Sequence, residues 1–279
     1  MTSDHSEHAE RPGDGPHTDF DAYAPRQMAS RVEAAGVAKA NQTFLQTTVL
    51  GVLAGAFIAF GALFYTLTIT ESALGFGPTR LLGGVAFSLG LILVIVGGAE
   101  LFTGNNLIVM AWADRKISLG QMLRNWGIVY VANLVGALGI AALAVAAGVF
   151  ALGDGAVGET AARIASGKLS LGAVEAFTRG ILCNMLVCLA VWLCFAARTV
   201  VGKIFAIVFP IAAFVGLGFE HSVANMFAIP VAMMAGSIDW QVAGFVRNLA
   251  VVTTGNIVGG SGFVALTYWL VYRPAARPE

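Results

Sequence analysis

Charged residues are scarce in this chain of 279 residues, and their scarcity excludes whole classes of protein. Asp, Glu, Lys and Arg make up 11% of the sequence, whereas soluble proteins carry about 25%. So few charges cannot cover the surface of a water-soluble globule of this length. Neither sign is in excess, because 16 basic residues balance 16 acidic ones. The basic surface of a nucleic-acid-binding protein is therefore missing.

Cysteines and the motifs of enzymes are also scarce. Three cysteines, Cys183, Cys188 and Cys194, fall within one apolar stretch. Their odd number and shared location predict packing residues rather than disulfides or a metal site. The sequence contains no phosphate-binding loop, no zinc-protease motif and no Ser-His-Asp set. We therefore expect that the protein is not an enzyme and uses neither a cofactor nor a metal.

Apolar residues, in contrast, are abundant and occur in long runs. They make up 57% of the chain, and the mean hydropathy is +0.79. A membrane-spanning helix needs about 20 apolar residues. Five stretches without a charge predict such helices, near 44–69, 81–99, 125–152, 173–197 and 245–271. A sixth apolar region, 204–238, is interrupted only by Glu220 and His221.

Two apolar regions have lengths that do not suit a straight helix. Residues 81–113 and 204–236 would each reach about 50 Å as continuous helices, which is too long for one crossing and too short for two. Each carries an acid near its middle, Glu100 or Glu220. We therefore predict that helices 2 and 5 are broken, at 98–105 and 217–222. The result is an all-α polytopic membrane protein with six transmembrane segments.

The two halves of the chain resemble each other. The first break reads GAELFTGN and the second reads GFEHSVAN, with Gly, Glu and Asn in register. Three pairs of segments align in this way: 98–105 with 218–225, 132–137 with 255–260, and 51–60 with 180–189. Because each copy has three spans, the copies enter the membrane from opposite sides. This predicts an inverted repeat whose broken helices meet near the midplane, where such architectures bind substrate.

Charge also predicts the boundaries and the orientation. The chain divides into a disordered polar cytoplasmic tail (1–30), a six-helix transmembrane domain (31–273) and a short cytoplasmic end (274–279). Loops 114–124 and 198–203 are rich in Lys and Arg, which favours the cytoplasmic side for them and for both termini. Loop 153–179 is then external, although it also carries three basic residues.

Two polar residues at the breaks are the main candidates for a functional site. His221 is the only histidine outside the tail, and a titratable ring at membrane depth is a functional candidate by default. Its alternative role is a neutral ring that caps free backbone groups. Thr103 lies in the first break, two places from the counterpart of His221. Its hydroxyl can bind the imidazole and orient it, or it can cap the next half-helix.

Other polar residues at the breaks are expected to be structural. Glu100 and Glu220 must be hydrogen-bonded or neutral at membrane depth. We expect each to accept backbone N–H groups that the break leaves free, with a proton relay as the alternative. Asn105 and Asn225 complete the same motif. Asn184, in helix 4, either donates to an anion or joins two helices.

These motifs resemble the formate/nitrite transporter family of bacterial anion channels. The resemblance covers about residues 30–273 and rests on AELFTGN, RGILCNMLVCLAVWL, FEHSVANMF and GNIVGG. It implies an aquaporin-like six-helix fold, a homopentamer with one pore in each protomer, and a place in the bacterial inner membrane. The last two motifs are most similar to the formate branch of the family.

The resemblance also implies roles for individual residues. It makes His221, Thr103 and Asn184 pore residues, and it makes Lys168 a cation of the vestibule. Four apolar residues lie on helices that should line the axis, namely Phe87, Leu91, Phe102 and Phe214. All of them except Phe102 match the family's constrictions.

The expected function is passage of a small monovalent anion, most of all formate, across the lipid bilayer. The anion moves passively or with a proton, through transient protonation at the central histidine. Nitrite, hydrosulfide or another small monocarboxylate remains an alternative substrate. A neutral-solute pore of the aquaporin type is a further alternative, but its Asn-Pro-Ala motif is absent from both breaks.

Overall fold

The computed structural model describes residues 22–272, and its regular structure is entirely helical over that range. Five helices are long and apolar enough to cross a membrane. They are α2 (Phe44–Ile69), α3 (Phe76–Gly97), α5 (Leu119–Ala146), α7 (Ala173–Ala196) and the continuous helix Val242–Tyr272. The last consists of α10 (Val242–Ile257), a π-helical stretch η3 (Val258–Leu266) and α11 (Thr267–Tyr272).

The two broken helices lie where the sequence predicts them. After α3 the chain leaves the helix, then continues as η1 (Gly104–Ile108) and α4 (Val109–Ala113). The second break separates α8 (Val200–Gly216) from α9 (Ser222–Met234). A glycine with positive φ follows each leading helix, Gly98 at +81° and Gly218 at +75°, and this conformation ends a helix. The all-α fold with six crossings is confirmed.

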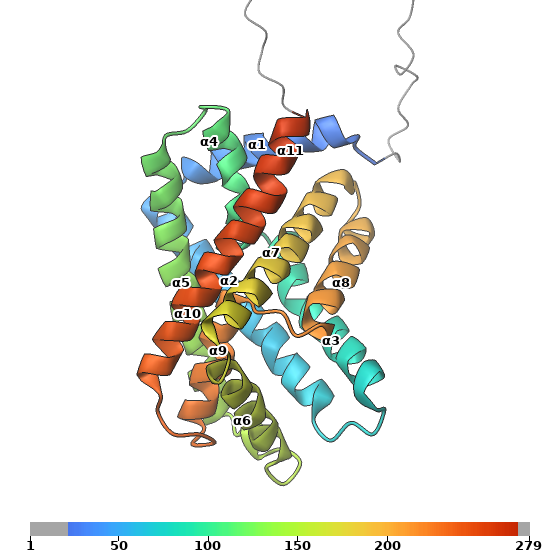
Figure 1. The fold of residues 1–279 in the computed structure, drawn as a ribbon, viewed down its shortest axis with the longest axis vertical. Helices are drawn as coiled ribbons and strands as arrows, with labels where there is room; N and C mark the ends of the chain where they lie inside the picture. Colours follow the sequence, from blue (N-terminus) through green and yellow to red (C-terminus); the bar gives the residue numbers. More distant parts are fainter. Residues whose placement is uncertain (1–21, 273–279) are drawn as a thin grey trace, which may run out of the picture.

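The inverted repeat is visible in the order of the helices. Each half begins with a short helix, α1 (Pro25–Ala40) or α6 (Ala156–Leu169), and then runs through a full span, a broken helix and a second full span. A short turn, η2 (Val149–Ala151), joins the halves. The two short helices lie at opposite ends of the molecule, as inversion requires (Figure 1).

Neither short helix is predicted by the run of apolar residues. α1 begins at Pro25, inside the predicted tail, and α6 occupies part of the predicted loop. Both are too polar to cross a membrane, so a search for spans passes over them. α1 and α11 lie at the same end of the molecule (Figure 1), in agreement with the predicted topology. Most of the tail and the residues from 273 onward lie outside the described residues.

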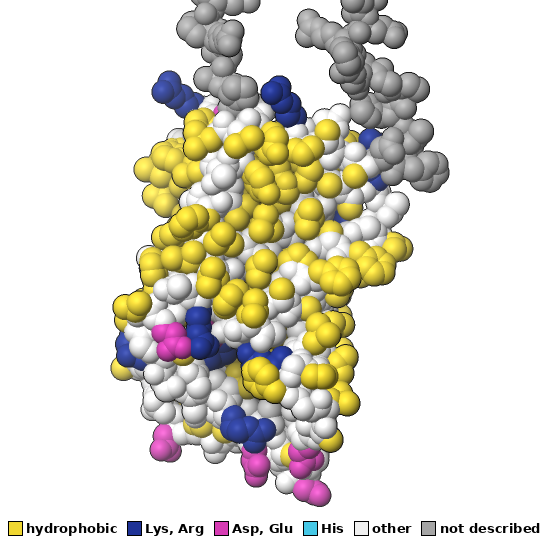
Figure 2. All heavy atoms as spheres, turned by 45° about the vertical axis from the view of Figure 1, so that its right-hand side comes forward, with side chains coloured by type: hydrophobic (Ala, Val, Ile, Leu, Met, Phe, Trp, Pro, Cys, Tyr) yellow, Lys and Arg dark blue, Asp and Glu magenta, His cyan; other side chains and the backbone are white. Residues whose placement is uncertain are grey.

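On the face shown in Figure 2, hydrophobic side chains form a broad band across the middle of the molecule, and the charged side chains gather toward its two ends. Many large apolar residues of the described chain are more than half exposed, among them Phe205, Phe209 and Leu270. A water-soluble protein does not leave so much apolar surface uncovered. The band therefore faces lipid or other protein chains.

Glycines allow α2 and α5 to touch along their backbones. A Cβ atom built on Gly136 would lie 2.0 Å from the carbonyl oxygen of Val52, and one built on Gly55 would lie 2.0 Å from that of Asn133. No side chain fits at either position. This contact matters because α5 supplies residues that hold the first break.

We predict that Gly136→Ala destabilises the protein, because the added methyl must push α2 and α5 apart, at a cost of ~1–3 kcal/mol. Thermal unfolding of the detergent-purified protein should show a lower midpoint. Gly139→Ala is the matched control, since a Cβ there meets nothing within 4 Å. Equal midpoints for the two variants would contradict the close contact.

Candidate functional site

One buried asparagine of α5 binds the backbone of the first break. The side-chain amide of Asn133 donates to the carbonyl oxygens of Glu100 (2.9 Å) and Gly51 (2.7 Å). Its Oδ1 accepts the backbone N–H of Phe102 at 2.9 Å. Non-helical backbone at membrane depth needs such partners because no water replaces them.

The second break is held in the same way from α10. The amide of Asn256 donates to the carbonyl oxygens of Glu220 (2.9 Å) and Gly180 (2.8 Å), and its Oδ1 accepts the N–H of Ser222 at 2.9 Å. The repeat aligns residues 132–137 with 255–260, but no role was predicted for the asparagine that both segments contain. Its presence at the same place in both motifs is the signal that could have identified it.

The two glutamates bind side chains rather than the backbone N–H groups that we expected. Glu220 accepts from the ammonium of Lys168 at 2.9 Å and from the amide of Asn225 at 2.7 Å. Asn225 also donates to Asn248, whose own amide donates to the carbonyl oxygen of Lys168 at 3.0 Å. The expectation that the glutamates accept backbone N–H groups is wrong. At the second break, Asn256 already accepts the backbone N–H that the break leaves free.

An equivalent network lies at the first break. Glu100 accepts from Lys39 at 2.9 Å and from Asn105 at 2.7 Å, and Asn125 connects Asn105 to the carbonyl oxygen of Lys39. Sequence reasoning missed Lys39 because it lies on α1, a helix that was not predicted. Each short helix thus supplies the cation for one broken helix. Of the three basic residues in the predicted external loop, only Lys168 is explained by this pairing with a glutamate of a break.

A cavity of about 440 Å³ opens on the side of the molecule that carries α1. We call it the terminal cavity. Three basic residues line it, Arg31, Lys39 and Lys203, and its inner end is apolar, with Leu91 and Leu101.

A second cavity, of about 450 Å³, opens from the opposite side, where α6 lies. We call it the distal cavity. Its inner end is formed by Phe87, Phe214 and His221. Four basic residues also line it, Arg80, Arg163, Lys168 and Arg179. Lys168 therefore lies where the vestibule cation was expected, although Glu220 compensates its charge.

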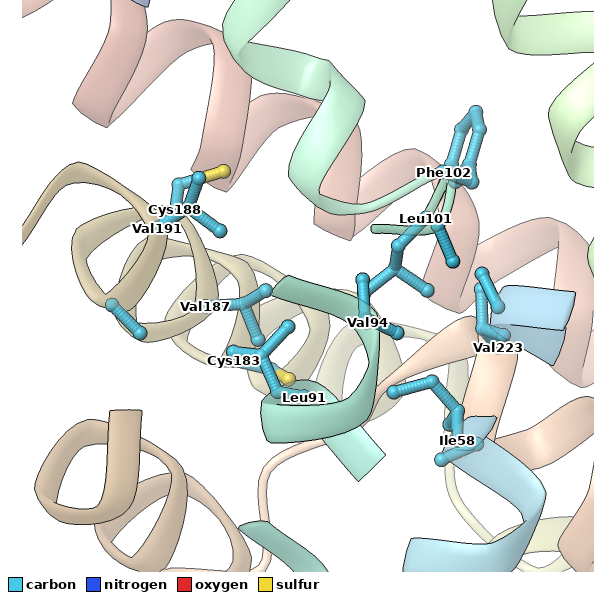
Figure 3. Packing of buried hydrophobic residues seen from close by; sticks show 14 of the residues in the cluster. Ile58, Leu91, Val94, Leu101, Phe102, Cys183, Val187, Cys188, Val191 and Val223 are labelled. Carbon is cyan, nitrogen blue, oxygen red and sulfur yellow. The ribbon is translucent and has the colours of Figure 1, made fainter. Parts of the chain in front are cut away.

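Only a thin apolar barrier separates the two cavities. Leu91 faces the terminal cavity and Phe87 faces the distal one, and the two are four residues apart on α3, or ~6 Å along the helix axis. The ring of Phe87 packs edge-to-face on that of Phe214, with centroids 5.5 Å apart. Leu91 belongs to one cluster of buried hydrophobic side chains with Cys183 and Val187 of α7 (Figure 3).

The single imidazole at this barrier has both ring nitrogens engaged. His221 caps α9, because its Nδ1 accepts the backbone N–H of Ala224 at 3.1 Å. Its Nε2 lies 2.8 Å from the hydroxyl oxygen of Thr103. An accepting Nδ1 carries no proton, so the neutral ring has its proton on Nε2 and donates to Thr103. The two breaks thus meet through one hydrogen bond, as the predicted pairing of Thr103 with His221 requires.

Asn184 lies behind this pair and lines neither cavity. Its amide donates to the carbonyl oxygens of Thr103 (3.3 Å) and Asn256 (2.7 Å) and to Asn106 Oδ1 (2.7 Å). Of the two roles considered for it, these bonds favour the joining of helices. Asn184 fixes the backbone that carries Thr103.

Phe102 does not reach the axis of the passage. Its ring packs edge-to-face on Tyr130 and Trp126 of α5, with centroids 4.9 and 6.1 Å apart. The neighbouring Leu101 lines the terminal cavity instead. Leu101 and Phe102 are adjacent in the non-helical part of the break, and their side chains lie in different surroundings.

Comparison with known proteins places this geometry in a family. A family model described as formate/nitrite transporter matches residues 26–270. The Formate channel FocA of Escherichia coli K12 is 42% identical over 272 residues, covering 91% of this chain and 95% of that protein. A solved structure described as a pentameric formate channel with formate bound is 40% identical, with a TM-score of 0.77 over 83% of this chain and 98% of its own. A structure described as an FNT family ion channel is 29% identical, with a TM-score of 0.78 over 88% and 98%.

We predict that Lys168→Met is strongly destabilising and that adding Glu220→Gln restores much of the loss. The single substitution leaves a carboxylate buried without its cation, and breaking such a pair costs ~3–5 kcal/mol. In the double variant, glutamine still accepts from Asn225 but carries no charge. Thermal unfolding midpoints of the three proteins test this. A double variant that is no more stable than Lys168→Met would show that the ion pair is not what holds the network.

Proposed function

This chain belongs to the formate/nitrite transporter family, and on that premise we propose that it is a membrane channel for small monovalent anions, with formate as its main substrate. The observation that carries the proposal is the arrangement of the two cavities. Both are lined by basic side chains, they open on opposite sides, and a barrier about one helical turn thick separates them. A single imidazole lies at that barrier.

The basic cavities and the apolar barrier select for different forms of the substrate. Lys and Arg side chains concentrate anions in both cavities. A bare ion between Phe87, Leu91 and Phe214 would have a cost of desolvation of up to tens of kcal/mol, whereas a neutral acid would not. We therefore propose that formate crosses the barrier as formic acid, after it gains a proton beside His221.

The bonds of His221 constrain how it supplies that proton. The ring at rest is neutral and donates through Nε2. A second proton on Nδ1 displaces the N–H of Ala224, and the loss of a helix cap costs only ~0.5–2 kcal/mol. The protonated ring is thus a transient state, formed as the anion approaches and lost as the acid leaves.

Charge supports an orientation with the terminal cavity on the cytoplasmic side of a bacterial inner membrane. The connections and the adjoining helix ends on that side carry Arg115, Lys116, Arg124, Arg198 and Lys203, as the positive-inside rule requires. We also propose a homopentamer with one pore in each protomer. The many exposed large apolar side chains, the apolar band on the face shown in Figure 2 and the pentameric assembly named for one solved relative support it.

The substrate class is tested by solute uptake into liposomes that contain the purified protein. Formate, nitrite and hydrosulfide are compared with urea, a small neutral solute close to formate in size. We expect fast uptake of formate and slow uptake of urea. Urea uptake at the rate of formate would contradict the anion channel and favour a neutral-solute pore.

We predict that His221→Asn folds but loses the rise in formate uptake at acid pH. Asparagine is a good helix N-cap, so it preserves the bond to Ala224, but it cannot carry a proton. Its pH profile of uptake is compared with that of the original protein. His221→Ala, which loses both the cap and the proton, separates the two effects. If the asparagine variant keeps the original profile, the proton reaches formate from cavity water, and His221 is a cap and hydrogen-bond donor only.

A further inference from the structure

The distal cavity has a charge pattern that the terminal cavity does not share. Glu220 is its acidic lining residue, and it is already paired with Lys168 at 2.9 Å. The other basic residues of its lining are three arginines, Arg80, Arg163 and Arg179, of which Arg179 is also paired with Glu175 outside the lining. They come from three different helices, α3, α6 and α7.

Two of these arginines bind the backbone at the start of the second break. Arg80 Nε donates to the carbonyl oxygen of Gly216 and Arg179 Nη1 to that of Gly218, both at 3.0 Å. A Cβ built on Gly218 would lie 2.8 Å from Arg80 Nη2 and 3.6 Å from Arg179 Nη1. The two guanidinium groups thus converge over one glycine.

The fold does not require this convergence, as the other half of the repeat demonstrates. The N–H of Glu220 donates to the carbonyl oxygen of Arg179, and the N–H of Glu100 donates to that of Leu50 in the same way. The position of Arg179 is therefore held by leucine in the first half. A Cβ built on Gly98, the counterpart of Gly218, meets nothing within 4 Å. The guanidinium pair is an addition specific to the distal cavity.

Most of the N–H groups of these arginines have no protein acceptor among the described residues. A guanidinium has five N–H donors. Arg80 donates to protein only through Nε, and Arg163 only through Nη2, to the hydroxyl of Thr160. Arg179 also binds Glu175. Planar guanidinium groups match oxyanions that have several oxygens, phosphate above all.

We propose that Arg80, Arg163 and Arg179 form a binding site for oxyanions with two or more negative charges, and that such an anion blocks the distal cavity. The block rests on the proposed channel function, whereas the binding does not. A dianion is attracted to each arginine about twice as strongly as formate is. It cannot follow formate across the barrier, because one proton does not neutralise it. The site thus makes uptake sensitive to multivalent anions on the distal side.

Inorganic phosphate, at a pH where the dianion predominates, is the probe. The first measurement is the thermal unfolding midpoint of the purified full chain, in phosphate and in chloride of equal ionic strength. Binding to the folded state raises the midpoint. We expect Arg163→Gln to raise the phosphate concentration at half-saturation about tenfold. This is the loss of affinity expected for one charge-assisted hydrogen bond. Arg163 is the variant of choice because it does not hold the break.

Lys203→Gln is the matched control, because it removes a cation from the terminal cavity. We expect it to leave the phosphate effect unchanged. Equal stabilisation of all three proteins, or none in the original protein, would overturn the proposal. If Arg163→Gln does not fold, Arg163→Lys replaces it, since lysine keeps the charge but loses the planar fork and should still weaken binding.

The second measurement is the initial rate of formate uptake with phosphate on the distal side. We expect inhibition in the original protein and less inhibition in Arg163→Gln. Phosphate that binds without slowing formate would overturn the block. No formate uptake in the absence of phosphate, together with stabilisation by phosphate, would instead refute the channel function and leave the binding site intact.

Discussion

The structure depends on one constraint, which is that backbone groups exposed inside a membrane need hydrogen-bond partners. Both breaks expose such groups, and one asparagine at each break binds two carbonyl oxygens and one N–H. Asn133 and Asn256 do this from the helices that end each repeat. Contacts at glycines allow α5 to pack closely on α2, and α10 on α7. Without these bonds the non-helical segments of the two breaks, which hold Thr103 and His221 in place, could not lie at membrane depth.

The passage follows from the way the two breaks meet. The repeat places two similar cavities on opposite sides and leaves about one helical turn of apolar side chains between them. The two halves differ in the polar residues that line the pathway. His221 occupies the position that leucine holds in the first half, and Arg179 likewise replaces a leucine. The arrangement of the helices is therefore symmetric, whereas the polar side chains along the pathway are not.

The sequence predicted the spans, both breaks and the inversion, because each depends on local hydropathy or on a repeated motif. It also predicted the contact of Thr103 with His221, since the repeat brings the two breaks together. It missed α1 and α6, which are too polar to register as spans, and with them Lys39 as the partner of Glu100. It placed Phe102 on the axis because hydropathy carries no information on the direction in which a side chain at a break points.

The central claim is that the substrate crosses the barrier as a neutral acid. It is tested most directly by measuring proton and formate uptake together in liposomes that contain the protein, a pH-sensitive dye and a dye for membrane potential. The account predicts that one proton enters with each formate, so that the lumen acidifies and no potential develops. Formate uptake that builds a potential and leaves the lumen pH unchanged would mean that the bare anion crosses, and it would contradict the account.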